Sequence, residues 1–555
     1  LEATYGSYDR IDVKGAYDLP LIKDQLALRV SGFTNNQTGF QTLLDYACAN
    51  PSTAGNIPVA GSAAGNCVIG HEGGTRRWGV RAALRYTPSS NVEVNISGDR
   101  TVDNSDPAPL SLFYAFAPFG APTYNGSPTG TPWDARFLPA KKYTTYATYR
   151  DTVAGFDAQA KTFTKGWGVS GDINWKIGDN LSLRSITAYR GLETQAGFDQ
   201  DGSPIGVATT LIYNTYHQFT QELRLSGTSH MLDWTVGGFY YNAKGVLLNT
   251  IDSGPTQFKT NDPVKTTSKS VFGHVVIHPV EGLNITAGIR YTDDRKTYQF
   301  TRYNLNNGPA NPAQGPLNNL PLQVYAGDRV DYRIGVDYRF SPEVMAYAQF
   351  STGYKGGGVN AKPFVAIQAV PFNPESIDSW EAGLKTDLAD NHVRLNLAGF
   401  YMKYKNIVLV NAAGYPGGCL PTAVPLCANP DPNYYPLSAL PFNAGDANIK
   451  GLELEADIRP VGGLSITGSL SYLDFKYTKL AVAALASGIS LKDYPPLTPK
   501  WKASGGIAYT FEMQNGATIT PRVDIDYQSK TYSDPANNGF YPAGLPQDPQ
   551  FANVN

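Results

Sequence analysis

Apolar and polar residues alternate one by one along many segments of the chain. Between positions 330 and 340, every even position is Val, Tyr, Ile or Phe, whereas the odd positions hold Asp, Arg and Gly. Successive side chains of a strand point to opposite faces, so this pattern predicts a strand with one apolar face and one largely charged face. Residues 283–292, 452–459 and 519–528 show the same period of two.

The connections between these segments alternate in length. The short ones are rich in Pro, Gly, Asn and Asp, the residues that tight turns require. They fall at residues 18–23, 88–91, 178–180, 227–230, 279–282, 341–343, 389–391, 460–463 and 513–516. The long ones fall at about residues 36–74, 104–160, 196–213, 245–264, 301–325, 354–374, 410–445, 479–498 and 531–550. Short turns at one end of a sheet and long loops at the other are typical of outer-membrane barrels.

Two strands for each short turn give eighteen strands, from residues 10–17 to residues 517–530. Residues 1–5 read as the end of an earlier strand and residues 551–555 as the start of a later one, so about twenty strands are visible. The predicted fold class is all-β, a transmembrane antiparallel β-barrel that forms one domain over residues 1–555 and is truncated at both ends. Bacterial barrels have even strand numbers, and we expect twenty-two in the complete barrel.

A soluble β-sandwich also alternates, but two features favour the membrane. The polar faces carry charges of both signs on strand after strand, and the apolar faces often end in an aromatic residue. Tyr86, Tyr291, Phe340 and Phe511 are examples. Aromatic residues at the ends of an apolar band are what membrane barrels place at the lipid interfaces.

Composition excludes several other classes. The chain has 45 basic and 47 acidic residues, so it has no basic field and we expect no nucleic-acid partner. A membrane-spanning helix needs about 20 consecutive apolar residues. The best candidate, residues 480–491, is shorter than this and contains Ser and Gly, so helical spans are excluded.

Seven segments together resemble a known family. They are YGSYDRIDVKGAYDLPL (5–21), LALRVSGF (26–33), QELRLSG (221–227), AGIRYTDDRK (287–296), STGYKGGGVN (351–360), ESIDSWEAGLKTDL (375–388) and IKGLELEADIRP (449–460). With them the chain resembles the barrel portion of TonB-dependent outer-membrane receptors of the iron-complex, or siderophore, type. The stretch STGYKGGGVN and the ESIDSWEAGLK after it are the most specific.

The resemblance implies location in the outer membrane of a Gram-negative bacterium and contact with its lipid. It also implies TonB-coupled import of a scarce extracellular ligand, most often a ferric siderophore. The family's N-terminal plug, its TonB box and its last strands are not in this chain, so coupling to the TonB complex would use a segment absent here. We expect a monomer. Uptake of cobalamin, oligosaccharide or aromatic compounds stays open, as do a passive porin and an adhesin or phage receptor.

The sequence offers little for catalysis. Its six His residues are scattered, and no G-x-S-x-G elbow is present. His274 and His278 share a strand face, but a zinc site needs three or four ligands in one place. We therefore predict that the protein is not an enzyme and has no catalytic residue, cofactor or bound metal.

The four cysteines form two close pairs. Cys48 and Cys67 lie in one long loop, and Cys419 and Cys427 lie in another. Four cysteines allow three connectivities. Because each pair shares an outer loop, where disulfides persist, we predict that Cys48 bonds Cys67 and that Cys419 bonds Cys427.

Candidate ligand contacts come from aromatic residues in the loops. The loop at residues 104–160 includes Tyr114, Trp133 and Phe137, which could clamp an amphipathic ligand. The alternative is that these aromatics pack the long loop on itself. Tyr354 and Lys355 begin the YKGGG stretch, where Lys355 offers a charge for an anionic complex and the glycines favour a hinge or loop turn. We also predict a gap between residues 551–555 and residues 1–5, where the closing strands are missing.

Overall fold

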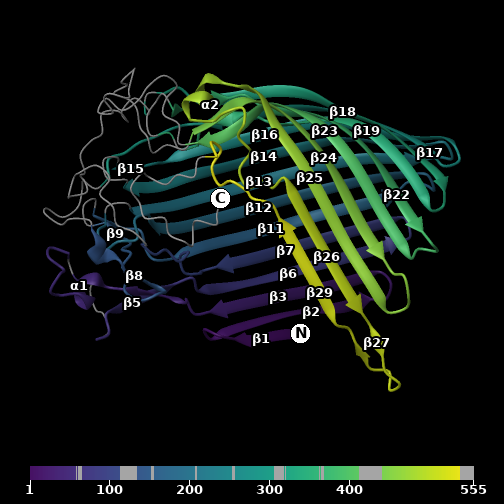
Figure 1. The fold of residues 1–555 in the computed structure, drawn as a ribbon. Coiled ribbons are helices and arrows are strands. Elements are labelled where there is room, and N and C mark those ends of the chain that lie inside the picture. Colours follow the sequence, from purple (N-terminus) through teal and green to yellow (C-terminus); the bar gives the residue numbers. More distant parts are fainter. Residues whose placement is uncertain are drawn as a thin grey trace.

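One antiparallel sheet dominates the computed structural model of the chain (Figure 1). The structure describes residues 1–57, 59, 65–112, 134–151, 155–206, 209–252, 257–305, 318, 320–361, 363, 368–369, 371–411 and 440–537. Twenty strands form the sheet, and each pairs with its neighbours along the chain. In Figure 1 the sheet curls round, so that the yellow-green strands near the C-terminus pass in front of the blue ones.

The strands of this sheet are long. They are β1 (Glu2–Gly6), β2 (Arg10–Ile22), β3 (Leu26–Gln37), β6 (Thr75–Ser89), β7 (Val92–Asp103), β11 (Thr162–Lys176), β12 (Leu181–Asp199), β13 (Thr209–Thr228), β14 (Leu232–Asp252), β15 (Gln257–Lys259), β16 (Asp262–Val280), β17 (Leu283–Tyr298), β18 (Gln323–Ser341), β19 (Val344–Lys355), β22 (Glu375–Leu388), β23 (Val393–Asn411), β24 (Leu440–Ile458), β25 (Leu464–Leu480), β26 (Trp501–Tyr509) and β29 (Arg522–Gln528). Apart from the short β15, they are the eighteen predicted strands and the predicted N-terminal fragment.

The other elements are short. They are β4 (Gln41–Leu44), α1 (Tyr46–Ala49), β5 (Val68–Glu72), a 3-10 turn (Ala135–Phe137), β8 (Thr144–Thr145), β9 (Arg150–Asp151), β10 (Phe156–Asp157), β20 (Gly358–Val359), β21 (Pro371–Phe372), α2 (Val482–Ala486), β27 (Phe511–Glu512) and β28 (Thr518–Ile519). No helix among the described residues is long and apolar enough to cross a membrane. Most of these short elements lie in the long connections, which gather at one end of the sheet (left in Figure 1). We call this the loop end.

The nine predicted short turns all join neighbouring strands at the other end of the sheet. Residues in the left-handed region make these turns tight. Gly282 has φ +80°, and a Cβ there would lie 2.8 Å from the carbonyl oxygen of Arg339. Ala389, Asp390 and Asn391 also have positive φ between β22 and β23.

The sheet is open within the described part of the chain, because no ladder joins β1 to β29 there. The strand predicted from residues 551–555 lies outside the described residues.

The register aligns the predicted faces of neighbouring strands. On β17 and β18, Ile285 lies opposite Val336, and Ile289 lies opposite Tyr332. Arg290 and Asp331 lie opposite each other on the other face. We call the face with Ile289 the outer face and the face with Arg290 the inner face. Large apolar side chains on the outer face stay exposed, Ile289 at 59% and Ile334 at 56%, as expected of a wall that lipid covers.

The polarity of the two faces reverses near the loop end of β23, β24 and β25. On β25 the outer face runs Leu464, Ile466, Gly468, Leu470 and Tyr472, and then Asp474 and Lys476. The inner face of the same strand is polar up to Ser471 and then apolar at Leu473, Phe475 and Tyr477. Such a reversal is expected where a barrel strand passes from the level of its apolar band to the packed loops.

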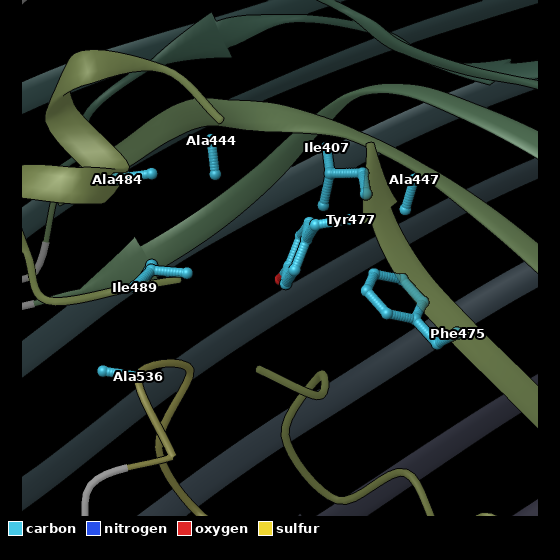
Figure 2. Close-up of a cluster of buried hydrophobic side chains, with 8 residues drawn as sticks. All are labelled: Ile407, Ala444, Ala447, Phe475, Tyr477, Ala484, Ile489 and Ala536. Atoms are coloured by element: carbon cyan, nitrogen blue, oxygen red, sulfur yellow. The ribbon is translucent and has the colours of Figure 1, made fainter. Parts of the chain in front are cut away.

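The described hydrophobic core is at the loop end. Phe475 and Tyr477 pack with Ile407, with Ala484 of α2 and with Ile489 of the following loop (Figure 2). Residues of β23, β24 and β25 thus bury their inner faces under loop residues. A membrane barrel needs no apolar core within its wall, so burial is concentrated where the loops meet.

Candidate functional site

A compact loop domain covers the loop end of strands β3 to β13. Tyr46 of α1 packs edge-on against Phe137 and Tyr146, with ring centroids 5.0 and 5.1 Å apart. Phe137 is fully buried, and Ile205 from another loop joins the same cluster. Segments that are distant in sequence therefore form one apolar core above the sheet.

A disulfide ties this loop domain together. Cys48 bonds Cys67, with Cα atoms 5.6 Å apart, which confirms the first predicted pair. Asp45 caps α1 by accepting the Cys48 N–H at 3.0 Å. Cys419 and Cys427 lie outside the described residues, so the second pair stays a prediction.

Buried acids also hold the loop domain. Tyr149 donates to Glu72 at 2.7 Å, and the Leu110 N–H donates to the same carboxylate at 3.1 Å. Burial raises the pKa of Glu72 above its usual range despite these two donors. Burial likewise raises the pKa of Asp201, beyond the end of β12, to about 6. The Glu72 carboxylate joins two loops, whereas Asp201 accepts the Ser203 N–H at 2.8 Å within its own loop. Burial moves the pKa of both carboxyls towards neutral pH.

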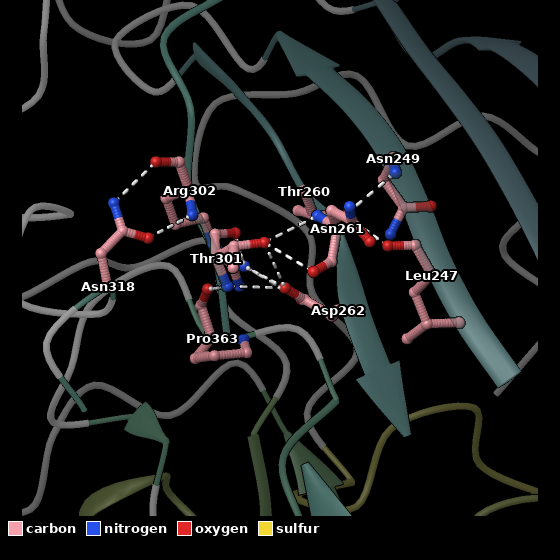
Figure 3. A network of polar contacts seen from close by, with 9 residues as sticks. All are labelled: Leu247, Asn249, Thr260, Asn261, Asp262, Thr301, Arg302, Asn318 and Pro363. Atoms are coloured by element: carbon pink, nitrogen blue, oxygen red, sulfur yellow. Dashed lines mark hydrogen bonds and ion pairs between the residues drawn. The ribbon is translucent and has the colours of Figure 1, made fainter. Parts of the chain in front are cut away.

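A second polar network joins three other loops (Figure 3). Arg302 donates to Asp262 at 2.9 Å, and both side chains are nearly inaccessible, at 3% and 2% exposure. The guanidinium also donates to the Pro363 carbonyl at 2.8 Å. It lies 5.0 Å from the ring centroid of Phe258. One cation thus connects the loops that follow β14, β17 and β19.

The YKGGG stretch packs on the inner side of the wall. Tyr354 donates to Asp294 at 2.7 Å, and the Arg329 guanidinium lies 5.6 Å from the Tyr354 ring centroid. Lys296 donates to the Gly357 carbonyl at 2.8 Å and to the Gly356 carbonyl at 3.4 Å. Two of the stretches that carry the family resemblance, YKGGG and AGIRYTDDRK, therefore meet at one place.

Close packing explains a glycine in this stretch. A Cβ on Gly357 would lie 2.3 Å from the Phe372 carbonyl oxygen and 2.6 Å from the Tyr325 ring. No larger residue fits without moving backbone. The stretch is thus a tightly packed loop turn, in line with the loop-turn alternative.

Further along the inner face, Arg290 lies between two aromatic rings. Its guanidinium is 5.5 Å from the Phe272 centroid and 5.8 Å from the Phe239 centroid, and it donates to Thr292 at 3.2 Å. Arg290 and Arg329 both lie on the inner face. Arg329 on β18 lies opposite Thr292, two residues along β17 from Arg290. Arg329 also pairs with Asp331 at 2.7 Å, whereas Arg290 has no carboxylate partner among the described residues. Together with Tyr354 the two arginines form what we call the inner cationic patch.

The structure distributes the five predicted ligand residues over different environments. Tyr354 is half-buried in the inner cationic patch, and Lys355 is exposed and paired with Glu375 at 3.1 Å. Phe137 is a core residue of the loop domain. Tyr114 and Trp133 lie outside the described residues. The described part therefore does not bring these residues together.

Arg290 and Arg329 were not predicted as site residues. The alternation places both on the inner face of their strands, but many other charged residues share that face. Their aromatic neighbours come from β14, β16 and β19, and only the register reveals them. Among the described residues, no group of three or more His, Cys, Asp and Glu side chains could hold a metal ion.

Comparison with known proteins defines the class. Residues 98–555 match the family model "TonB dependent receptor-like, beta-barrel", so the chain belongs to this family. The large antiparallel sheet is the TonB-dependent receptor barrel fold, and relatives in the family are transport receptors rather than enzymes.

Relatives and solved structures are similar but distant. The pesticin receptor of Yersinia enterocolitica is 24% identical over 340 residues, which are 60% of this chain and 44% of that protein. The metal-pseudopaline receptor CntO of Pseudomonas aeruginosa is 27% identical over 211 residues, 38% of this chain and 25% of that protein. The chain thus spans less than half the length of these relatives.

Two solved structures share the fold. The ferric yersiniabactin uptake receptor FyuA from Yersinia pestis superimposes with a TM-score of 0.67 at 17% identity, covering 96% of this chain and 68% of that one. The siderophore receptor PiuA from Acinetobacter baumannii gives 0.63 at 15% identity, covering 96% and 72%. At this identity the likeness shows the fold alone.

Proposed function

We propose that the full-length protein is a receptor of the Gram-negative outer membrane that binds a ferric siderophore at the loop end and imports it with energy from TonB. The observation that carries this proposal is the inner cationic patch. Arg290 and Arg329 present guanidinium groups beside aromatic rings, directly below the packed YKGGG turn. Anionic iron chelates that carry aromatic groups fit such a surface.

The loops support capture from outside. A disulfide, a buried acid–tyrosine pair and the Arg302 network hold them in place over the sheet. Loops that are already held in place lose less conformational entropy when a ligand binds. We further propose that Tyr114 and Trp133 contact the ligand from residues 104–160, together with Tyr354 and Lys355. The buried position of Phe137 instead favours the alternative that it packs the loop.

The test uses the full-length protein in a strain that lacks its own siderophores. Uptake of radioactive iron is measured with a panel of ferric siderophores, and affinity is measured by fluorescence quenching on purified protein. The variant Arg290→Gln with Arg329→Gln should weaken affinity about 10- to 100-fold, as expected for losing charge-assisted hydrogen bonds. Arg184→Gln is the matched control, because Arg184 lies on the inner face and pairs with Asp172 near the short turns.

Two results would count against the proposal. Unchanged affinity and uptake in the double variant would remove the inner cationic patch from the binding site. Uptake that continues without TonB would instead favour a passive porin. Cobalamin, oligosaccharides and aromatic compounds belong in the same ligand panel, since each is an alternative cargo.

A further inference from the structure

The outer face carries a group of lysines just beyond its apolar band. The register places Trp380 beside Tyr401, and it places Asp378 beside Lys403 one row nearer the loop end. The Lys403 row continues through Asn448 to Lys476. These rows lie where the outer face changes from apolar to charged, which is the level of lipid headgroups in a membrane barrel.

Two of these lysines have no acidic partner among the described residues. Lys403 lies 5.6 Å from the Trp380 ring centroid, and Lys476 is exposed. Their strands are separated only by β24, so their backbones are about 10 Å apart. Both ammonium groups can therefore reach one anionic headgroup placed between them.

The neighbouring charges leave an excess of positive charge. Lys450 and Lys500 share Asp474, each at 3.6 Å, and Lys405 pairs with Asp378 at 2.8 Å. Five lysines thus face two carboxylates. Such an excess at headgroup level attracts anionic lipid.

An apolar groove on the outer face begins next to these lysines, on the side away from the loop end. Its volume is about 800 Å³. Small residues of adjacent strands, Ala348, Ala382 and Gly399, form its floor, because they occupy one row of the register. Trp380 and Tyr401 rise on the side towards the lysines. A row of small side chains between large ones leaves space of the width that an acyl chain fills.

The adjacent strands β14 to β18 also carry outer-face lysines without an ion pair among the described residues, since Lys265 lies opposite Lys244. On β16, β17 and β18, Lys269 lies opposite Asp293, which in turn lies opposite Asp328. Lys403 likewise lies opposite Asp378, so the two parts differ in the groove, which no described residue of β14 or β16 lines. The combination of unpaired lysines and groove is therefore a feature of β19 to β25 rather than of the whole rim.

From these observations we propose that this surface binds a membrane lipid with a phosphate-bearing headgroup. Lys403 and Lys476 hold the phosphate, and an acyl chain lies in the groove along Ala382 and Gly399. The inference rests on the proposed membrane location but not on the ligand that enters at the loop end.

The test measures quenching of Trp380 fluorescence by lipids with brominated chains. Full-length protein is placed in phosphatidylcholine vesicles that contain brominated phosphatidic acid or brominated phosphatidylcholine, and the signal of a Trp380→Phe variant is subtracted. We expect a preference of about fivefold for phosphatidic acid. The variant Lys403→Gln with Lys476→Gln should reduce that preference to near onefold. Lys265→Gln with Lys269→Gln, the same charge change on β16, should retain it.

Three results would overturn the proposal. These are no preference in the wild-type protein, an unchanged preference in the Lys403 and Lys476 variant, and an equal loss in the β16 control.

Added inorganic phosphate at constant ionic strength should not compete, and competition would assign the lysines to free phosphate. Ala382→Phe fills the groove without changing charge, so quenching by both lipids should fall, and unchanged quenching would remove the acyl chain from the groove. Ferric siderophore uptake is scored separately, so a failure of the proposed function remains distinguishable.

Discussion

Arg–Asp ion pairs have different roles in the wall formed by the sheet and at its loop end. In the wall, Arg184 and Asp172 join neighbouring strands at 2.5 Å, with side chains 47% and 27% exposed. At the loop end, Arg302 and Asp262 are only 3% and 2% exposed, and they lie forty positions apart. Exposed pairs contribute little because water screens them, whereas a buried pair is costly to break. Polar side chains therefore solubilise the inner wall but hold the loops together.

The largest expected effect comes from breaking the buried pair. Arg302→Met leaves the Asp262 carboxylate buried and unpaired, which should destabilise the loops by about 3–5 kcal/mol. Hydrogen exchange of residues 257–262 and 299–305 measures the change. Arg184→Met is the control in the wall, with an expected effect of about 0–1 kcal/mol. Equal effects of the two variants would remove the distinction between wall and loop end.

A charge on the outer face should be nearly as disruptive. Ile334 is 56% exposed on that face, so Ile334→Arg should lower the free energy of unfolding by about 2–4 kcal/mol if the residue lies near the bilayer centre. Denaturant unfolding of the full-length protein in vesicles gives the value. Ser379→Arg, on the inner face of β22, should have little effect, and the reverse ranking would show that the faces are assigned the wrong way round.

Removing the disulfide should loosen only the loop domain. The double variant Cys48→Ala with Cys67→Ala should cost about 3 kcal/mol, because the bond closes a loop of 19 residues. Limited proteolysis of the loops should accelerate while denaturant unfolding of the wall stays unchanged. Peptide mapping without reduction also tests the second predicted bond, between Cys419 and Cys427. A change confined to the wall would contradict the separation of the two regions.

The smallest expected effect is a pH dependence of the loop domain. The pKa of Asp201 is about 6, above that of an unfolded Asp, so the folded loop retains a proton that the unfolded chain has lost. Loop stability should therefore fall by on the order of 1 kcal/mol as the pH rises from about 4 to about 6. Hydrogen exchange of residues 201–206, corrected for intrinsic rates, measures this. Burial also raises the pKa of the neighbouring Asp199, so the double variant Asp199→Asn with Asp201→Asn should flatten the dependence, and an unchanged slope would assign the titration to another group.

Local patterns in the sequence were enough to predict the wall. Each strand of β17 and β18 shows its two faces directly in the alternation, and each short turn shows its Gly, Pro, Asn or Asp residues. Strand pairing follows from chain order, because every short turn joins neighbours. The Cys48–Cys67 bond was predictable for the same reason, since both residues lie in one loop.

The loop end was not predictable in this way. Long loops have no period, and their contacts join residues that are distant in sequence, such as Glu72 with Tyr149 and Asp262 with Arg302. Phe137 was a candidate ligand contact because composition does not distinguish an aromatic residue that packs in a loop core from one that contacts a ligand.

The sequence by itself determined the class of fold, the strand order, the two faces of the wall and the family. Period-two alternation and turn residues are local properties, so they survive without knowledge of the fold. Only the tertiary structure decided which inner arginines meet aromatic rings and which outer lysines lack an acid. The physical reason is that these contacts run across strands, where the register places side chains together that the chain keeps far apart.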